Sequence, residues 1–141
     1  MLSRKAIPAV LAAVLAAVLA AVLIAAAPAS ASTNTTKYGS TGAPDRVLRP
    51  GCHDYRYHYR VTVPTNDWTL ETFLVDPRGE KLSSDAFSSE SDPDVGHGTF
   101  RICKPSTKPG IFKIKAKINW YNGGTDTKAW FRPSYFRLSP P

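Results

Sequence analysis

Residues 111–121 read IFKIKAKINWY, and their side chains alternate with a period of two. From Phe112 to Trp120 every second residue is apolar, and the residues between them are three lysines and an asparagine. This pattern is typical of a β-strand with one buried face and one exposed face, because successive side chains of a strand point to opposite sides. We therefore predict a strand from Ile111 to Tyr121, the clearest strand of the chain.

The flanking sequence repeats this signal between turn residues. Further strands are predicted for residues 53–63, 68–75, 99–103 and 128–138, with a short return strand at 80–82. Residues 68–75 carry apolar side chains at both parities, which predicts a central strand covered on both faces. Pro133 suits an edge strand or a bulge, and residues 83–98 read as a polar loop. No segment has a helical period, so the sequence predicts an all-β fold, an antiparallel β-sandwich.

The first 31 residues differ from the predicted strands because they contain a long apolar run without alternation. Arg4 and Lys5 precede an unbroken apolar run from Ala9 to Ala27, and Ala29-Ser30-Ala31 offers a peptidase small residues. This order predicts a helical secretory signal peptide over residues 1–31. An uncleaved membrane anchor is the alternative, because the run is long enough to span a bilayer. Alanine makes up about half of the run and no basic cluster follows it, so we expect cleavage, no remaining membrane span and a secreted, extracellular protein.

The chain after residue 31 has the length of one domain. Residues 32–46 are rich in Ser, Thr and Gly and are expected to form a flexible leader, followed by a β-sandwich domain over residues 47–141. The formal charge falls from +7 to +5 when Arg4 and Lys5 are removed. A moderately basic surface of this kind attracts anionic polymers, although many soluble proteins carry a similar charge.

Cys52 and Cys103 are the only cysteines of the chain. Outside the cell they are expected to form a single disulfide. Two free thiols serving catalysis or a metal are the alternative, and no CxxC spacing supports it. Cys52 precedes a predicted strand, Cys103 ends another, and both fall off the predicted core face. We therefore expect a bond that joins two strand ends and closes a loop of roughly 50 residues, worth about 4 kcal/mol.

Two resemblances follow from these residues. Cys52, Trp68 and Cys103, with Asp94-Val95-Gly96 before the second cysteine, resemble an immunoglobulin-like domain. Residues 75–80 and 109–114, VDPRGE and PGIFKI, are similar to secreted bacterial sandwich modules of the pre-peptidase C-terminal type, as in actinobacterial proteins. The resemblance implies an immunoglobulin-like sandwich with a binding or accessory role beside enzymes and without catalysis, and it supplies no functional residues.

The motifs of common catalytic sites are missing from the sequence. It contains neither a Gly-x-Ser-x-Gly nucleophile elbow nor a phosphate-binding glycine loop. Carboxylates such as Asp76 and Glu80 flank a turn, where aspartate is favoured for conformational reasons. We expect a protein that is not an enzyme and has no cofactor.

The candidate metal ligands in the sequence are three histidines and the acidic residues of the loop 85–94. His53 and His58 fall on opposite faces of one predicted strand and cannot bind one ion together. His97 lies near Asp92 and Asp94 in the predicted loop, where a His/Asp site is one interpretation and a solvated histidine the simpler one. The acidic loop 85–94 offers oxygen ligands for calcium, but the spacing matches no defined calcium loop. We predict no metal site and leave calcium binding by this loop open.

The lysine row is the most suggestive surface feature. Lys113, Lys115 and Lys117 share one strand face, roughly 7 Å apart, and Arg56 and Arg60 form a similar row on another strand. If the two strands share a sheet face, a basic stripe results. It would suit teichoic acid, an acidic polysaccharide, nucleic acid or a membrane surface. We expect a cell-wall or other polyanionic polymer and no nucleic acid. The alternative is a solvated lysine face that prevents aggregation.

Aromatic side chains crowd the last predicted strand, at Trp130, Phe131, Tyr135 and Phe136. Some of them either face outward, where they stack on sugar rings or dock a secreted protein, or cover the core. The leading hypothesis is a secreted, non-catalytic module that binds an anionic polymer or glycan or associates with the cell envelope. A secreted inhibitor that presents the loop Lys104–Gly110 is the alternative, and an enzyme or toxin with an unrecognised site is the third. The oligomeric state is not indicated.

Overall fold

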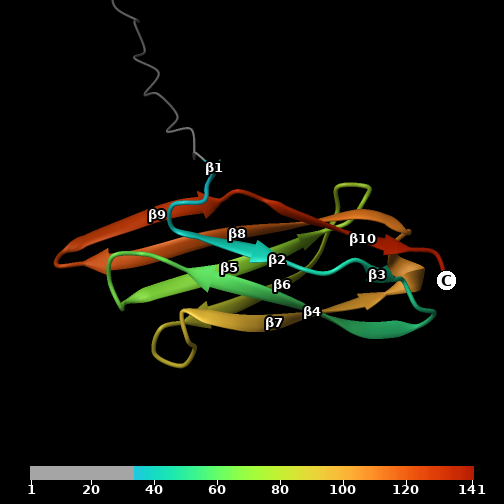
Figure 1. The fold of residues 1–141 in the computed structure, drawn as a ribbon, viewed down its shortest axis with the longest axis horizontal. Helices are drawn as coiled ribbons and strands as arrows, with labels where there is room; N and C mark the ends of the chain where they lie inside the picture. Colours follow the sequence, from blue (N-terminus) through green and yellow to red (C-terminus); the bar gives the residue numbers. More distant parts are fainter. Residues whose placement is uncertain (1–33) are drawn as a thin grey trace, which may run out of the picture. The chain divides into compact units, whose positions relative to one another are not determined.

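The computed structural model describes residues 34–141 (Figure 1). The predicted signal peptide lies outside the described residues. Within residues 34–141 no helix has the length and apolar character that crossing a bilayer requires. The predicted all-β fold, an antiparallel β-sandwich, is confirmed: these residues form two sheets, and two clusters of buried side chains, with Phe87 against both, fill the space between their inner faces.

The larger sheet has seven strands and the smaller sheet three. The larger sheet consists of β1 (Asn34–Thr35), β3 (Arg46–Val47), β5 (Trp68–Val75), β6 (Lys81–Ser88), β8 (Gly110–Asn122), β9 (Thr125–Phe131) and β10 (Ser134–Ser139). The smaller sheet consists of β2 (Gly39–Gly42), β4 (Cys52–Val61) and β7 (Val95–Cys103), and a 3-10 turn at Lys104–Ser106 follows β7. Pairing is antiparallel except for the short strands β1 and β3, which run parallel to β9 and β10.

β8 is the longest strand and the centre of the larger sheet, as its sequence pattern leads one to expect. It pairs with β5 on one side and with both β9 and β10 on the other. Its inward side chains are all at most 5% exposed: Phe112, Ile114, Ala116, Ile118 and Trp120. Burial of these apolar surfaces supplies the main driving force for packing the larger sheet against the smaller one.

Tyrosines of β4 contribute the opposite side of the core. Tyr57 stacks on Phe100 with ring centroids 4.2 Å apart, and its hydroxyl shares a 2.6 Å hydrogen bond with Thr72 Oγ1. The Tyr59 hydroxyl donates to the carbonyl oxygen of Pro93 at 3.1 Å. Buried tyrosines need such partners because an unpaired hydroxyl is costly in an apolar interior. Burial also raises the pKa of Tyr57 above its ordinary value of 10.0.

Two glycines of β7 make room for these rings. Gly98 is the cross-strand partner of Tyr57, and Gly96 is the partner of Tyr59. A Cβ atom at Gly98 would lie 2.3 Å from the Tyr57 hydroxyl oxygen, and one at Gly96 would lie 2.4 Å from that of Tyr59. The aromatic rings therefore occupy the space that side chains of β7 would otherwise fill.

The disulfide joins the ends of two neighbouring strands in the smaller sheet. Cys52 is the first residue of β4 and Cys103 the last residue of β7, and the two are direct cross-strand partners. The predicted disulfide is confirmed, and so is its position at strand ends away from the core. It differs in this respect from the bond of immunoglobulin domains, which links one sheet to the other.

The expected flexible leader over residues 32–46 is wrong for its second half. β2 pairs with β4 along Gly39–Gly42, and the Tyr38 ring packs against Trp120 at 4.5 Å between centroids. The physical reason is that pairing at a sheet edge uses backbone groups, which the small polar residues Gly-Ser-Thr-Gly supply as well as any others. The domain therefore begins before residue 47.

The expected loop over residues 83–98 is also largely wrong. β6 extends to Ser88 and β7 begins at Val95, which leaves a short connection between the two. β6 is an edge strand paired only with β5 within its sheet, so polar side chains are tolerated along it. In β7 the alternate glycines hide the apolar period that marks other strands.

The last predicted strand consists of two strands along the same side of β8 (Figure 1). Trp130 in β9 pairs with Lys117, and Ser134 in β10 pairs with Ile114. The chain advances four residues from Trp130 to Ser134 while β8 advances three from Ile114 to Lys117. One extra residue on one strand is the definition of a β-bulge. Pro133 lies at this irregularity, as expected for a residue that cannot donate to the ladder.

Candidate ligand-binding surface

The outer face of the larger sheet carries the predicted lysine row. Lys113, Lys115 and Lys117 all project from β8 on the face opposite the core. Lys117 forms an ion pair with Glu71, its cross-strand partner on β5. This pair reduces the positive charge at one end of the row, so Lys113 and Lys115 carry the charge that remains available to a ligand.

Two aromatic rings lie among these lysines. Phe73 of β5 and Trp130 of β9 face each other with ring centroids 6.0 Å apart. The Lys115 ammonium lies 5.0 Å from the Trp130 ring centroid, and the Lys81 ammonium lies 5.4 Å from that of Phe73. Contacts of this kind contribute about 0.5–1 kcal/mol at exposed sites. We call Phe73, Lys81, Lys113, Lys115 and Trp130 the aromatic–lysine surface.

The aromatics of the last predicted strand divide between the two faces. Phe131 and Phe136 are buried in the core. Trp130 is half-buried on the outer face, and Tyr135, beside Lys113, is 62% exposed. Phe73 also points outward and is only half-buried. The outer face of β5 is therefore not covered by a further layer, and the expectation that this strand is covered on both faces is wrong.

The two basic rows do not form one stripe. Arg56 and Arg60 project from β4 on the outer face of the smaller sheet, whereas the lysine row belongs to the larger sheet. The condition that the strands share a sheet face is not met, because the core separates the two outer faces. On the outer face of the smaller sheet, Arg101 pairs with Asp54 at 3.4 Å.

Asp92 and Asp94, two of the acidic residues considered for calcium, have structural partners. Asp92 Oδ2 accepts hydrogen bonds from the Ser88 amide at 2.9 Å and the Ser91 hydroxyl at 3.0 Å. Asp94 Oδ1 accepts one from the Trp68 indole at 2.8 Å. Among residues 34–141 no group of three or more His, Cys, Asp or Glu side chains could hold a metal ion.

One of the three histidines, His97, differs from its expected place. His97 lies in strand β7 and not in a loop, and its cross-strand partner is His58 on β4. His53 faces the other side of β4, where Nε2 lies 2.7 Å from the Pro50 carbonyl oxygen. The sequence pattern separates His53 from His58 correctly, but it does not reveal the pairing of His58 with His97.

Asp76 is the one buried carboxylate among the described residues, and its surroundings keep it ionised. Its oxygens accept hydrogen bonds from the Glu80 amide at 3.0 Å, from the Arg78 amide and Nε at 2.9 Å, and from the Thr107 hydroxyl at 2.9 Å. Burial alone would raise the pKa of Asp76, but these hydrogen bonds outweigh it and lower the pKa from 3.8 to about 2. This carboxylate organises a turn and is unsuited to proton transfer near neutral pH.

The loop that an inhibitor would present is attached to the same turn. Besides the Thr107 contact, Arg78 Nη2 donates to the Ser106 carbonyl oxygen at 2.7 Å. Residues 104–110 therefore form part of the network around Asp76.

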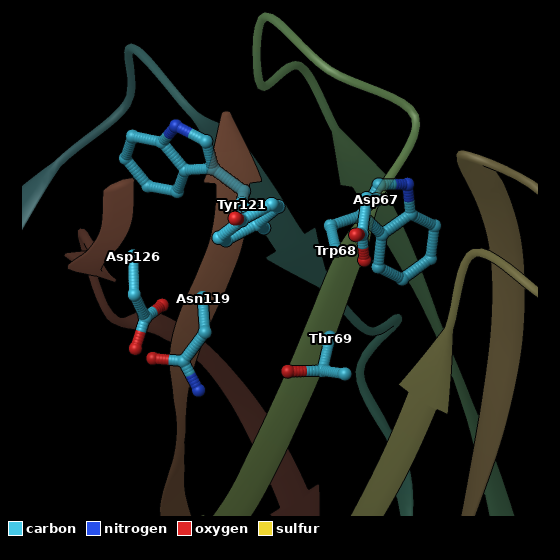
Figure 2. Close-up of a pocket in the computed structure, with 7 residues that line it drawn as sticks. Asp67, Trp68, Thr69, Asn119, Tyr121 and Asp126 are labelled. Atoms are coloured by element: carbon cyan, nitrogen blue, oxygen red, sulfur yellow. The ribbon is translucent and has the colours of Figure 1, made fainter. Parts of the chain in front are cut away.

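A polar hollow of about 100 Å³ lies at the end of β5 and β8. Figure 2 shows Asn119 and Asp126 on one side of it and Thr69 on the other. Asn119 Oδ1 is buried and has no hydrogen-bond partner among the described residues. The sequence gives one indication of this site. Asn119 follows Lys113, Lys115 and Lys117 on the same strand face, where an uncharged amide replaces the lysine.

Comparisons with known proteins add little to this description. No protein-family model and no curated protein matches the sequence. Among solved structures, the chain is similar to the CARDB domain of the PF1109 protein from Pyrococcus furiosus, determined in complex with di-metal ions. The TM-score is 0.41 and the identity 14%, over 76% of this chain and 97% of that chain. By its own structure the chain is an antiparallel β-sandwich with one disulfide.

Proposed function

We propose that this protein is a secreted, non-catalytic binding module that holds an acidic polysaccharide on its aromatic–lysine surface. The observation that carries the proposal is the placement of Lys115 over the half-buried Trp130 ring, with Phe73 and Lys81 repeating the arrangement alongside. Aromatic faces offer flat apolar area to sugar rings, and ammonium groups attract acidic substituents.

The arrangement suits an extended ligand better than a small molecule. The surface is spread over strands β5, β6, β8 and β9, and no deep pocket encloses it among the described residues. Side chains two residues apart on one strand face are roughly 7 Å apart. Lys113 and Lys115 can therefore contact successive acidic groups of a polymer that lies along β8.

The alternative, a solvated lysine face that only prevents aggregation, does not require aromatic partners. Isolated lysines would serve that purpose, whereas Phe73 and Trp130 leave apolar area facing solvent in the middle of the row. An interaction surface combines partly accessible rings with ammonium groups that, among the described residues, form no ion pair, as Lys113 and Lys115 do here.

The experiment compares retention of the purified, disulfide-bonded protein on immobilised heparin, used as a model acidic polysaccharide. Lys113→Gln with Lys115→Gln is expected to elute at clearly lower salt than the wild type. The matched control is Lys104→Gln with Lys108→Gln, which removes the same charge from the loop that precedes β8 and leaves the aromatic–lysine surface unchanged. If both double variants lose retention equally, binding depends on net charge alone and the proposed surface is wrong.

Trp130→Ala tests the stacking component separately. Removal of the indole is expected to weaken polysaccharide binding about threefold to tenfold, in keeping with the free energy of an aromatic contact. The binding constant is measured by isothermal titration calorimetry, and circular dichroism confirms that the fold is retained. An unchanged binding constant would leave a purely ionic interaction and remove the sugar-stacking role.

A further inference from the structure

A second feature, a pocket of about 250 Å³, lies on the outer side of the smaller sheet where the chain passes from β2 to β3 of the larger sheet. Three strands contribute cationic or imidazole side chains to its lining: Arg46 from β3, Arg56 and His58 from β4, and His97 from β7. Pro44 and Tyr57 complete it. Arg56, His58 and His97 of this pocket lie across the core from the aromatic–lysine surface, and the two share no residue.

The ladder between β4 and β7 brings the two imidazoles close together. Just beyond the ends of the ladder, the Lys104 amide donates to the Gly51 carbonyl and the Val61 amide donates to the Asp94 carbonyl. Odd-numbered residues of β4 thus occupy the hydrogen-bonded pairs, and even-numbered residues such as His58 occupy the others. Side chains of non-hydrogen-bonded pairs are the closer ones in an antiparallel ladder. His58 and His97 are therefore immediate neighbours on the surface.

Gly42 on β2 limits the position of the His58 ring from the other side. Gly42 is the cross-strand partner of His58, and a Cβ atom on it would lie 2.6 Å from Cε1 and 2.7 Å from Nε2 of that ring. The imidazole thus occupies the space that a side chain of β2 would take. The ring therefore lies over Gly42 and stays exposed on the outer face of the smaller sheet.

The pocket is rich in N–H donors and poor in acceptors. Within residues 34–141 neither Arg46 nor Arg56 takes part in an ion pair, and neither imidazole has a hydrogen-bond partner. The one ion pair on this face, between Arg101 and Asp54, lies nearer the disulfide end of the ladder. A set of guanidinium and imidazole groups without a carboxylate favours an anion, because these groups bind oxyanions through charge-assisted hydrogen bonds.

We propose that this pocket binds a single tetrahedral oxyanion group, a phosphate or a sulfate. Its oxygens would accept hydrogen bonds from Arg46, Arg56 and the two imidazoles. A metal ion is disfavoured because only two of the lining side chains are metal ligands and two guanidinium charges lie beside them. Free inorganic anions and phosphate or sulfate esters share this chemistry.

The test follows the imidazole resonances of the three histidines by NMR at constant pH and ionic strength. Addition of inorganic phosphate, and separately of sulfate, is expected to shift the signals of His58 and His97 in a saturable manner. His53, on the other side of β4, is the internal control and is expected to stay unchanged. A parallel titration with glycerol phosphate shows whether an ester binds more tightly than the free anion.

Two variants show whether phosphate binding depends on the pocket or only on the net charge of the protein. Arg56→Gln is expected to weaken phosphate binding at least about tenfold, because it removes a charged donor from the pocket. Arg60→Gln removes the same charge from the same strand outside the pocket and is expected to change binding less than about twofold. Circular dichroism confirms that both variants are folded.

Three results would overturn the proposal. The first is a shift that does not saturate or that includes His53 equally, which would indicate diffuse ion association. The second is an equal effect of Arg56→Gln and Arg60→Gln. The third is tight binding of Zn²⁺ to His58 and His97 without saturable phosphate binding, which would make the pair a metal site.

Discussion

At the scale of single residues, Gly98 of β7 leaves the space that the Tyr57 ring fills. Gly98→Ala places a methyl group 2.3 Å from the Tyr57 hydroxyl oxygen inside a packed core, and the ring cannot move without breaking its contacts with Phe100 and Thr72. Overpacking of this kind costs about 1–3 kcal/mol. Urea unfolding should show that loss of stability.

Gly42→Ala is the matched control for this prediction. The added methyl group meets an aromatic ring at a similar distance, but His58 is exposed and can rotate away. The loss of stability should therefore be smaller than for Gly98→Ala. Equal losses in the two variants would mean that the Tyr57 ring is not fixed by its surroundings.

Asp76 makes the free energy of unfolding depend on pH in the acidic range. Its pKa is lowered to about 2 in the folded protein, against about 3.9 in an unfolded chain. Because the folded pKa is the lower one, the contribution, up to about 2–3 kcal/mol, is complete above the unfolded pKa and disappears as pH falls from about 4 to 2. Thermal unfolding across that range should show a loss of stability that Asp76→Asn largely lacks, and parallel curves for the two proteins would contradict this.

The sheet face of a side chain was predictable where the strand alternation is intact. Contacts between residues far apart in the sequence were not predictable. The parity of residues 53–61 correctly separates the tyrosines from Arg56, His58 and Arg60. The contact between His58 and His97 depends on the register of β4 against β7, which the sequence of either strand leaves open. Asp76, interpreted from the sequence as a turn former, is also a buried acceptor because Thr107 and Arg78 meet it in three dimensions.

At the scale of elements, the disulfide fixes the ladder of β4 and β7 at one end. Replacing Cys52 and Cys103 together by serine should lower the free energy of unfolding by about 2–5 kcal/mol, mainly because the unfolded chain loses a constraint. The fold should survive at low temperature, since the core lies elsewhere. Urea unfolding measures the loss, and an unchanged midpoint would show that the bond contributes nothing to stability.

Strands with a clear period were predictable, and strands at edges were not. The bounds predicted for β5 match the structure, and those for β8 differ by one residue at each end, because both strands bury alternate large side chains. β2 and β6 lie at edges and pair through backbone groups, so their Ser- and Gly-rich sequences resemble loops. The aromatic–lysine surface was predictable only in part, because Phe73 and Lys81 come from strands whose order the sequence does not determine.

At the scale of the whole molecule, the two candidate sites lie on opposite outer faces with the core between them. We expect them to act independently, because substitutions far apart without shared partners have nearly additive effects. Lys113→Gln with Lys115→Gln should leave the phosphate affinity of the Arg46–Arg56 pocket within about twofold. Calorimetric titration measures this affinity, and a large change would mean that one ligand contacts both faces or that the faces are coupled.

The unequal burial of the three tryptophans turns one of them into a natural optical reporter. Trp68 and Trp120 are at most 5% exposed, whereas Trp130 lies half-open on the aromatic–lysine surface. Iodide in solution should therefore quench emission chiefly from Trp130, helped by attraction to Lys115 beside it. A polysaccharide bound across this indole would shield it from iodide. Reduced quenching would therefore report ligand binding without an added label.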